Sequence, residues 1–303
     1  MDSKATADVE SKSSPNFIVI CTDDQTYRAI GYNNPDVKTP HLDKLATEGL
    51  IFNKAYVATP ICAASRASIM TGVYPQQHGV IALASEQFKK YKTGGARAEH
   101  TLPNQLRKAG YRCVFWGKSH IGDPTAYGFS EGAELGDYSD IQTFAKANAF
   151  LTEAAANTAP FFLWLAPRQP HLPLHPTKKW RNIYDENKLI LDPNFRESPL
   201  QESINNQGVP GEFYYRDSDN KDNWRKLPAG PPRDESTIRL FMKAYYATIS
   251  HLDNQVGLLP FGLVKFDRLF PSNKTTASEG GMPILSVNTL VGSSPHNSVF
   301  LCS

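Results

Sequence analysis

Three short, largely apolar runs divide the chain, and each ends at polar residues. They cover residues 16–21 (NFIVIC), 111–116 (YRCVFW) and 161–166 (FFLWLA). An apolar run of this length without polar alternation is typical of a strand that is buried on both faces, as in a parallel sheet. The pattern therefore predicts three buried strands.

Four other stretches have a helical composition and recognisable ends. Two of them are followed by a glycine, Gly49 and Gly110, in the position where helices commonly end. The predicted helices run from Thr39-Pro40 to Gly49, over residues 102–109, from Asp140 to Ala156 and over residues 235–257. Strands that alternate with helices indicate an α/β fold, with a mostly parallel (mixed) central sheet flanked by helices.

Three stretches lack a clear periodicity. Residues 1–15 are polar and predict a flexible leader. Residues 172–234 are rich in Pro, Asn, Asp and Gly, and we interpret them as a long insertion or loop region. Residues 258–303 contain many Ser, Pro and Asn, and we expect neither helix nor strand there.

Composition and charge exclude several classes of protein. Of the 303 residues, 40% are apolar and 20% are charged, as in soluble globular domains, and the net charge is only +2. We therefore expect no nucleic-acid partner and no binding to anionic membranes. No apolar run is long enough to predict a membrane span. Residues 1–15 lack the apolar core of a signal peptide. Four scattered cysteines predict neither a disulfide framework nor a zinc site. The sequence therefore does not identify the cellular compartment.

Polar residues follow each predicted strand, and they are residues with useful chemistry. Asp23 and Asp24 follow the first strand, Lys118 and His120 the second, and His171 the third. Ligands of parallel sheets bind outside the carboxyl ends of the strands, so we expect these side chains to converge. Adjacent carboxylates suit a hard cation such as Ca²⁺ or Mg²⁺. The alternative is a solvated turn in which one acid caps a helix.

The segment CAASRASIMTG, residues 62–72, is the most specific motif. It resembles the signature of the sulfatase family, Cys-x-Pro-Ser-Arg followed by Thr-Gly, with Ala64 where Pro is commonest. The surrounding sequence is also similar to the family over residues 16–257: FIVICTDDQ, TPHLDKLATEGLIFNKAY, YPQQHGV, LPNQLRKAGYRCVFWGKSHIG and the PHLP that contains His171. The resemblance implies an alkaline-phosphatase-like sulfatase domain, of which residues 16–257 would be the N-terminal part and 258–303 a tail foreign to the family.

The resemblance also implies a reaction and roles for the site residues. A maturation enzyme would oxidise Cys62 to Cα-formylglycine, whose hydrate attacks the sulfur of a sulfate ester and then expels sulfate. The metal, Ca²⁺ or Mg²⁺, would bind Asp23, Asp24 and position 62. Arg66, one helical turn after Cys62, and Lys118 would hold the diol or the sulfate oxygens. His120 would act as a base near the diol, and His171 would donate a proton to the leaving group.

The sequence departs from the family after residue 257. The family takes further metal ligands from a later Asp-Asn-Gly or Asp-His-Gly motif, and residues 258–303 contain neither. We therefore expect an incomplete C-terminus, with a lost reading frame as the preferred explanation, and little activity from this polypeptide. The alternatives are a phosphate or phosphonate ester hydrolase with unmodified Cys62, and a non-catalytic remnant. The substrate would be a sulfated small molecule or a sulfated carbohydrate, with a cleft that could involve Tyr184, Tyr214, Tyr215 and Trp224.

Overall fold

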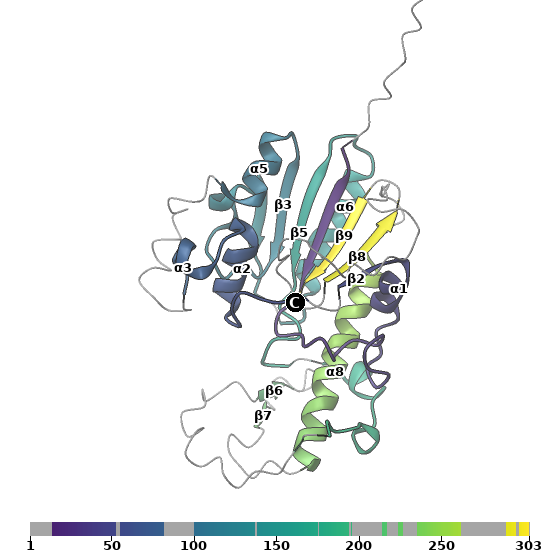
Figure 1. Cartoon of the computed structure of the whole chain (residues 1–303). Helices are drawn as coiled ribbons and strands as arrows, with labels where there is room; N and C mark the ends of the chain where they lie inside the picture. Colours follow the sequence, from purple (N-terminus) through teal and green to yellow (C-terminus); the bar gives the residue numbers. More distant parts are fainter. Residues whose placement is uncertain are drawn as a thin grey trace, which may run out of the picture.

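The structure is a computed structural model of the chain, shown in Figure 1. It describes residues 14–52, 55–81, 100–136, 138–174, 176–193, 195, 214–216, 224–226, 235–261, 289–294 and 297–302. The leader predicted for residues 1–15 lies almost entirely outside this described part.

A seven-stranded mixed sheet forms the centre of the molecule, in the order β2-β8-β9-β1-β5-β3-β4. The neighbours β9, β1, β5, β3 and β4 are parallel, and β8 is antiparallel to both β2 and β9. This arrangement confirms the predicted α/β fold. The strands are β1 (Asn16–Cys21), β2 (Gly49–Phe52), β3 (Arg112–Gly117), β4 (Glu131–Glu134), β5 (Phe161–Ala166), β8 (Thr289–Ser294) and β9 (Asn297–Cys302), while β6 (Tyr214–Arg216) and β7 (Trp224–Lys226) form a separate hairpin.

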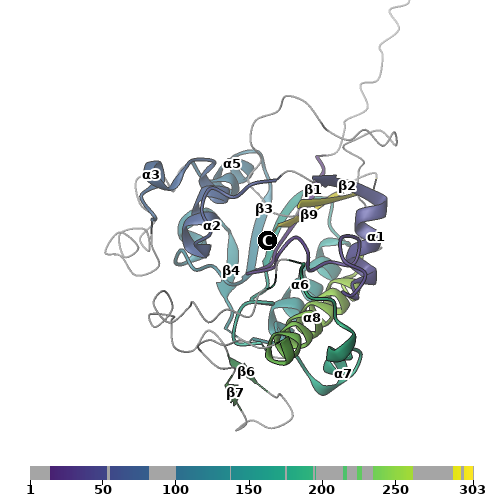
Figure 2. The same ribbon diagram turned by 60° about the horizontal axis from the view of Figure 1, so that its bottom comes forward.

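Helices cover both faces of the sheet. Successive side chains of a strand point to opposite faces, so residues of β1 contact helices on both sides. Ile18 and Ile20 of β1 pack with side chains of α1, α6 and α8 on one face. Val19 and Cys21 pack with α2 on the other face, and Figure 2 shows the two groups of helices on opposite sides. The helices are α1 (Pro40–Glu48), α2 (Cys62–Thr71), α3 (Pro75–His78), α5 (Leu102–Lys108), α6 (Ile141–Ala154), α7 (Lys178–Arg181) and α8 (Glu235–Gly257), with short 3₁₀ helices η2 (Pro124–Tyr127) and η3 (Glu186–Lys188).

One expectation about local structure was wrong. Residues 289–294 and 297–302 form β8 and β9, although no strand was expected in 258–303. Strand β9 pairs with β1 on the side opposite β5, and β8 pairs with β9. Backbone hydrogen bonds to a distant strand stabilise them, and a local sequence pattern does not reveal such pairing. The helix that was predicted to run from Thr39-Pro40 to Gly49 does end at Gly49, which is extended (φ −121°) and begins β2 directly.

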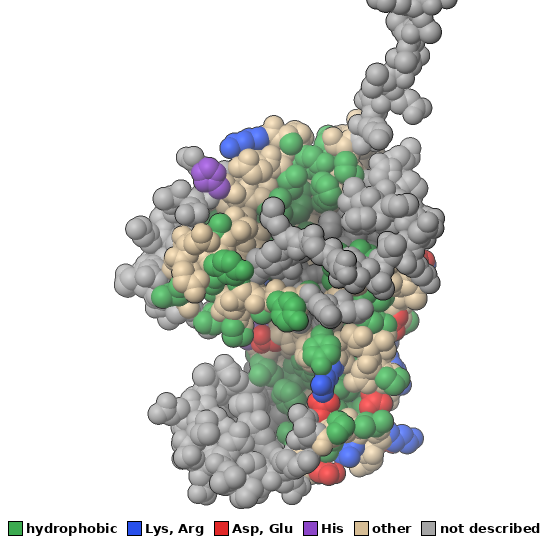
Figure 3. All heavy atoms as spheres, in the orientation of Figure 1, with side chains coloured by type: hydrophobic (Ala, Val, Ile, Leu, Met, Phe, Trp, Pro, Cys, Tyr) green, Lys and Arg blue, Asp and Glu red, His purple; other side chains and the backbone are tan. Residues whose placement is uncertain are grey.

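The described surface combines charges of both signs. Figure 3 shows acidic and basic side chains together on the lower part of one face, where α7, η3 and α8 lie. The ion pair between Lys243 of α8 and Glu186 of η3, at 2.5 Å, joins two of these elements. Within the described ranges, no helix is both long enough and apolar enough to cross a bilayer.

Candidate active site

The carboxyl ends of the adjacent parallel strands β1, β5 and β3 open on one rim of the sheet. The segments that follow these strands carry the two acids, the lysine and the two histidines singled out from the sequence. Helix α2 begins at the same rim and adds two more residues. The structure thus brings together Asp23, Asp24, Lys118, His120, His171, Cys62 and Arg66.

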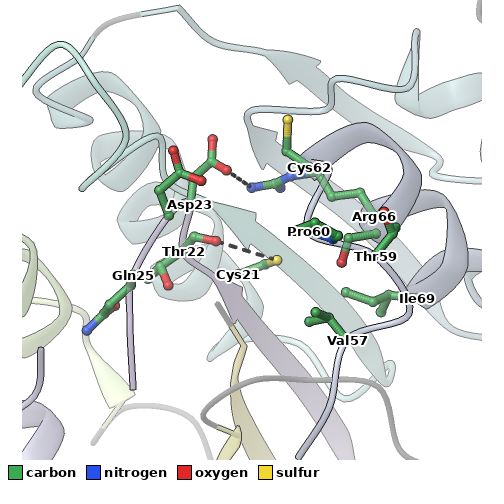
Figure 4. Close-up of a pocket in the computed structure, with 12 residues that line it drawn as sticks. Cys21, Thr22, Asp23, Gln25, Val57, Thr59, Pro60, Cys62, Arg66 and Ile69 are labelled. Atoms are coloured by element: carbon green, nitrogen blue, oxygen red, sulfur yellow. Dashed lines mark hydrogen bonds and ion pairs between the residues drawn. The ribbon is translucent and has the colours of Figure 1, made fainter. Parts of the chain in front are cut away.

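Asp23 is buried between two cations. The Lys118 ammonium contacts one carboxylate oxygen of Asp23 directly, and the Arg66 guanidinium lies 3.7 Å from the other, as Figure 4 shows for Arg66. Arg66 also donates a 2.9 Å hydrogen bond to the carbonyl of Lys118, which fixes the two cations relative to each other. Burial alone would raise the pKa of Asp23, but the charges of Arg66 and Lys118 outweigh it and lower the pKa. Asp23 is therefore ionised, and the cluster keeps one positive charge in excess.

Asp24 has a different environment from its neighbour. Its side chain is 56% exposed and its carboxylate lies 3.5 Å from Nε2 of His171. Partial desolvation, followed by the negative charge of Asp23, raises the pKa of Asp24. The backbone of Asp24 has a φ of +61°, in the left-handed region that non-glycine residues rarely adopt. The turn after β1 is thus held in an uncommon conformation.

Cys62 is the first residue of α2, and its sulfur lies 3.0 Å from Nδ1 of His120. Burial raises the pKa of the Cys62 thiol. Burial and the nearby charge of Lys118 lower the pKa of His120 to about 4. Both groups are therefore neutral near pH 7, and a hydrogen bond joins the sulfur to the ring. An unmodified thiol in this environment is a poor nucleophile, because the thiolate is the reactive form.

A cavity of about 180 Å³ lies between the end of β1 and α2. Polar residues, among them Asp23, Asp24 and Arg66, line part of its wall, and Val57, Pro60 and Ile69 line another part. Pockets for drug-sized ligands are roughly 300–1,000 Å³. The cavity therefore suits a small anionic group better than a whole sugar ring.

Gly117 explains how Lys118 reaches the site. It is the last residue of β3 and has a φ of +114°. A Cβ at this position would lie 2.1 Å from the carbonyl oxygen of Ala166 in β5. The close approach lets the amide of Lys118 donate a 2.7 Å bond to the same carbonyl. Gly117 was not singled out from the sequence; its place directly before Lys118 was the available signal.

Asp140 fixes the segment that leads to His171. Its buried carboxylate accepts hydrogen bonds from the backbone amides of Arg168 and Gln169, both at 2.8 Å. The carbonyl of Gln169 in turn accepts a 3.3 Å bond from the amide of Asp23. The sequence indicated Asp140 only as a helix start, because its partners lie 28 residues away or more.

The two acids after β1 are candidate ligands for a divalent cation. Asp23 and Asp24 offer carboxylate oxygens, which Ca²⁺ and Mg²⁺ prefer. Desolvation and then the charge of Asp23 raise the pKa of Asp24, and a cation would relieve the repulsion between the two acids. In the part of the chain that the structure describes, however, no group of three or more His, Cys, Asp or Glu residues could hold a metal. Asp23 and Asp24 therefore fit a cation, but they supply only part of its ligand shell.

Tyr184, considered for a substrate cleft, is a packing residue. It is buried beside Tyr246, its hydroxyl lies 2.6 Å from Oγ of Ser250, and it accepts a 2.9 Å bond from the amide of Lys38. The side chains of Tyr214, Tyr215 and Trp224 lie outside the described residues.

Comparison with known proteins places the chain among sulfatases. The family model "Sulfatase" matches residues 15–260. An ulvan-active sulfatase of Formosa agariphila is 30% identical over 243 residues, and the match covers 68% of this chain and 44% of that protein. The human N-sulphoglucosamine sulphohydrolase is 32% identical over 161 residues, 52% of this chain and 32% of that protein. The chain thus spans less than half the length of these curated relatives.

Solved structures share the fold at low sequence identity. The structure of the protein BT4656 in complex with its substrate, D-glucosamine-2-N,6-O-disulfate, matches with a TM-score of 0.59 and 21% identity. The match covers 80% of this chain and 61% of that one. The phosphonate monoester hydrolase of Agrobacterium radiobacter matches with a TM-score of 0.55 and 17% identity, over 80% of this chain and 58% of that one. The fold alone therefore does not distinguish a sulfatase from a phosphonate hydrolase.

Proposed function

The chain belongs to the sulfatase family, and from that premise we propose that its site cleaves sulfate esters, with sulfated carbohydrates as the substrate class. The named relatives support the substrate class, because one acts on ulvan and another is named for sulphoglucosamine. A structural neighbour was solved with a disulfated glucosamine as its substrate.

One observation carries the proposal: the Cys62–His120 pair lies beside a buried cluster with excess positive charge. Lys118 and Arg66 share the single carboxylate of Asp23. Buried, preorganised cations stabilise an anion at little reorganisation cost. The two side chains thus offer charge for sulfate oxygens next to the position from which a nucleophile would attack.

The nucleophile is proposed to come from formylglycine at position 62, made from Cys62 by a maturation enzyme. Its hydrated aldehyde would supply one hydroxyl as the nucleophile towards sulfur and a second hydroxyl whose deprotonation would release sulfate. His120 is neutral near pH 7 and already contacts the side chain at position 62. It is therefore suited to take that proton.

His171 is proposed to protonate the leaving oxygen. The carbonyl of Leu172 lies 2.5 Å from Nδ1, so Nδ1 carries a proton and donates it to that bond. The transferable proton must then be on Nε2, the atom that lies 3.5 Å from the carboxylate of Asp24. The sum of the steps consumes water and yields an alcohol and sulfate.

Asp23, Asp24 and position 62 are proposed to hold Ca²⁺ or Mg²⁺. A bound cation would add positive charge at the sulfate oxygens. Ca²⁺ usually takes about 6–8 oxygen ligands, so two carboxylates leave most positions to water. We therefore expect weak cation binding and low turnover by this polypeptide.

The test is to produce the chain with a maturation enzyme and analyse the peptide that contains residue 62 by mass spectrometry. Sulfate release from an aryl sulfate and a sulfated saccharide is then compared between the wild type, Cys62→Ala and the control Cys113→Ala, a core thiol away from the site. We expect slow sulfate release that requires the aldehyde and is lost only in Cys62→Ala.

Two outcomes would contradict the proposal. Hydrolysis of a phosphate or phosphonate ester by protein in which Cys62 is an intact thiol would favour a phosphate or phosphonate ester hydrolase. Absence of any turnover in protein that carries the aldehyde and excess Ca²⁺ would favour a non-catalytic remnant.

A further inference from the structure

The hydroxyl of Tyr245 in helix α8 contacts the turn after β1. Tyr245 donates a 2.6 Å hydrogen bond to the carbonyl of Asp24 and accepts a 3.0 Å hydrogen bond from the amide of Thr26. A phenol has one proton to donate and can accept in return, so one atom links the two backbone groups of this turn. Burial raises the pKa of Tyr245, which keeps the donated proton in place.

The turn has a conformation that needs such a link. Asp24 has a φ of +61°, and residues held in sparsely populated backbone regions persist only when their surroundings fix them. Tyr245 bonds the carbonyl of Asp24 itself and the amide two residues later. These hydrogen bonds fix the position of the Asp24 backbone and therefore the point from which its side chain extends.

The phenol ring is itself held firmly. It stacks on Phe241 with a centroid distance of 6.4 Å and an interplanar angle of 8°. It also packs beside a small cluster of Leu174 and Ala244, to which Leu172 contributes. Tyr245 therefore joins the Asp24 turn to the same packing that supports the segment after His171.

We propose that Tyr245 is a positioning residue for the cation site: its hydroxyl holds Asp24 in the left-handed conformation that presents its carboxylate beside Asp23. The proposal rests on the proposed function, since it assumes that these two acids bind the cation. Residues behind the metal ligands commonly change metal affinity by about 10–100-fold when they are altered. Tyr245 would act through Asp24, without touching the cation.

The test uses Tyr245→Phe in the full chain, because this change removes the hydroxyl and keeps the stacked ring. Tyr246→Phe is the matched control: it lies next to Tyr245 in α8, and its hydroxyl accepts a 3.2 Å bond from the side chain of Asn34, away from the Asp24 turn. Ca²⁺ affinity is measured by calorimetric titration. Hydrogen exchange of the Thr26 amide and thermal stability without Ca²⁺ are measured in parallel.

We expect Tyr245→Phe to weaken Ca²⁺ binding by about tenfold or more and to speed up exchange at Thr26. Tyr246→Phe should change neither, although both variants lose a similar amount of thermal stability. Equal Ca²⁺ affinity and equal Thr26 exchange in the two variants would overturn the proposal. If the wild type binds no Ca²⁺, the cation part of the proposed function fails. Hydrogen exchange of the Thr26 amide then tests the positioning role by itself. Faster exchange only in Tyr245→Phe supports that role, and unchanged exchange overturns it.

Discussion

Asp23 and Asp24 are neighbours in the sequence with opposite electrostatic environments. Asp23 is 3% exposed and lies between Lys118 and Arg66, whereas the side chain of Asp24 is 56% exposed. Removal of one partner from a buried ion pair leaves uncompensated charge in a region of low dielectric constant. The same chemical change should therefore have very different effects at the two positions.

We predict that Asp23→Asn lowers the free energy of unfolding by about 3–5 kcal/mol, because two buried cations lose their counter-charge. Asp24→Asn, the matched control, should change it by less than about 1 kcal/mol, as exposed pairs do. Urea denaturation in a buffer that contains a metal chelator measures the free energy of unfolding of both variants. Similar losses at the two positions would show that the Asp23 cluster is not the buried ion pair described above.

Gly117→Ala is predicted to destabilise the chain by about 2 kcal/mol or more, since it combines a strained φ with a clash against backbone. A Cβ at Gly136 would meet no described atom within 4 Å, so Gly136→Ala is the control. Thermal unfolding of the two variants gives the comparison. If Gly117→Ala has wild-type stability, the close approach of β3 to β5 is not required.

The sequence predicted that the proposed site residues would lie together, because they follow strands and belong to recognisable motifs. Lys118 and His171 could be placed at one rim from the order of strands and polar residues along the chain. The residues that hold them could not be predicted in the same way. Asp140 and Tyr245 act on backbone groups that are 28 or more residues distant, and no local pattern encodes such a partner.

At the scale of elements, α8 supports three separate parts of the molecule. Tyr245 forms hydrogen bonds with the turn after β1, and Nδ1 of His251 lies 3.2 Å from the side-chain Nε2 of Gln169. Asp253 accepts hydrogen bonds from the amides of His41 and Leu42 at the start of α1, at 3.3 and 2.8 Å. Amides in the first turn of a helix need such acceptors, so a distant side chain caps α1.

His251 makes stability depend on pH. Burial, with a smaller effect from Lys179, lowers its pKa from 6.5 to about 4. The unfolded chain binds this proton more readily, so the stabilisation is complete above pH 6.5 and is lost as the pH falls towards 4. We predict that His251→Gln removes up to about 3 kcal/mol of the loss in unfolding free energy between pH 7 and 4. Parallel pH profiles of the wild type and the variant would contradict this.

The elements were predictable to the extent that they have a local signature. The predicted strands 16–21 and 161–166 and the helix 235–257 coincide with β1, β5 and α8. The short strand β2 (GLIF) and the strands β8 and β9 were not predicted, because their stability depends on pairing with distant partners.

At the scale of the whole molecule, the sheet joins segments that are far apart in the chain. Strand β1 pairs along its entire length with β9, from Asn16 with Asn297 to Cys21 with Cys302. The other side of β1 pairs with β5. Removal of β9 would leave a buried central strand with an open edge, which favours association with other chains.

We predict that a chain ending at residue 261 loses cooperative unfolding and aggregates, as measured by light scattering and thermal denaturation. A chain that lacks residues 1–13 is the control and should unfold like the wild type, because that segment is predicted to be a flexible leader. A soluble, cooperatively folded 261-residue chain would show that the sheet does not need β8 and β9.

The pairing of β1 with β9 also affects how the protein is made. Strand β1 leaves the ribosome long before its neighbour β9, because nearly all of the described chain lies between them. Domains fold during synthesis only when their parts are available, and pairing of segments far apart in sequence is slow. The strand that leads into the turn with Asp23 and Asp24 therefore stays half paired until β9 has been synthesised. Cellular yield of this protein should depend on chaperones that shield an unfinished sheet.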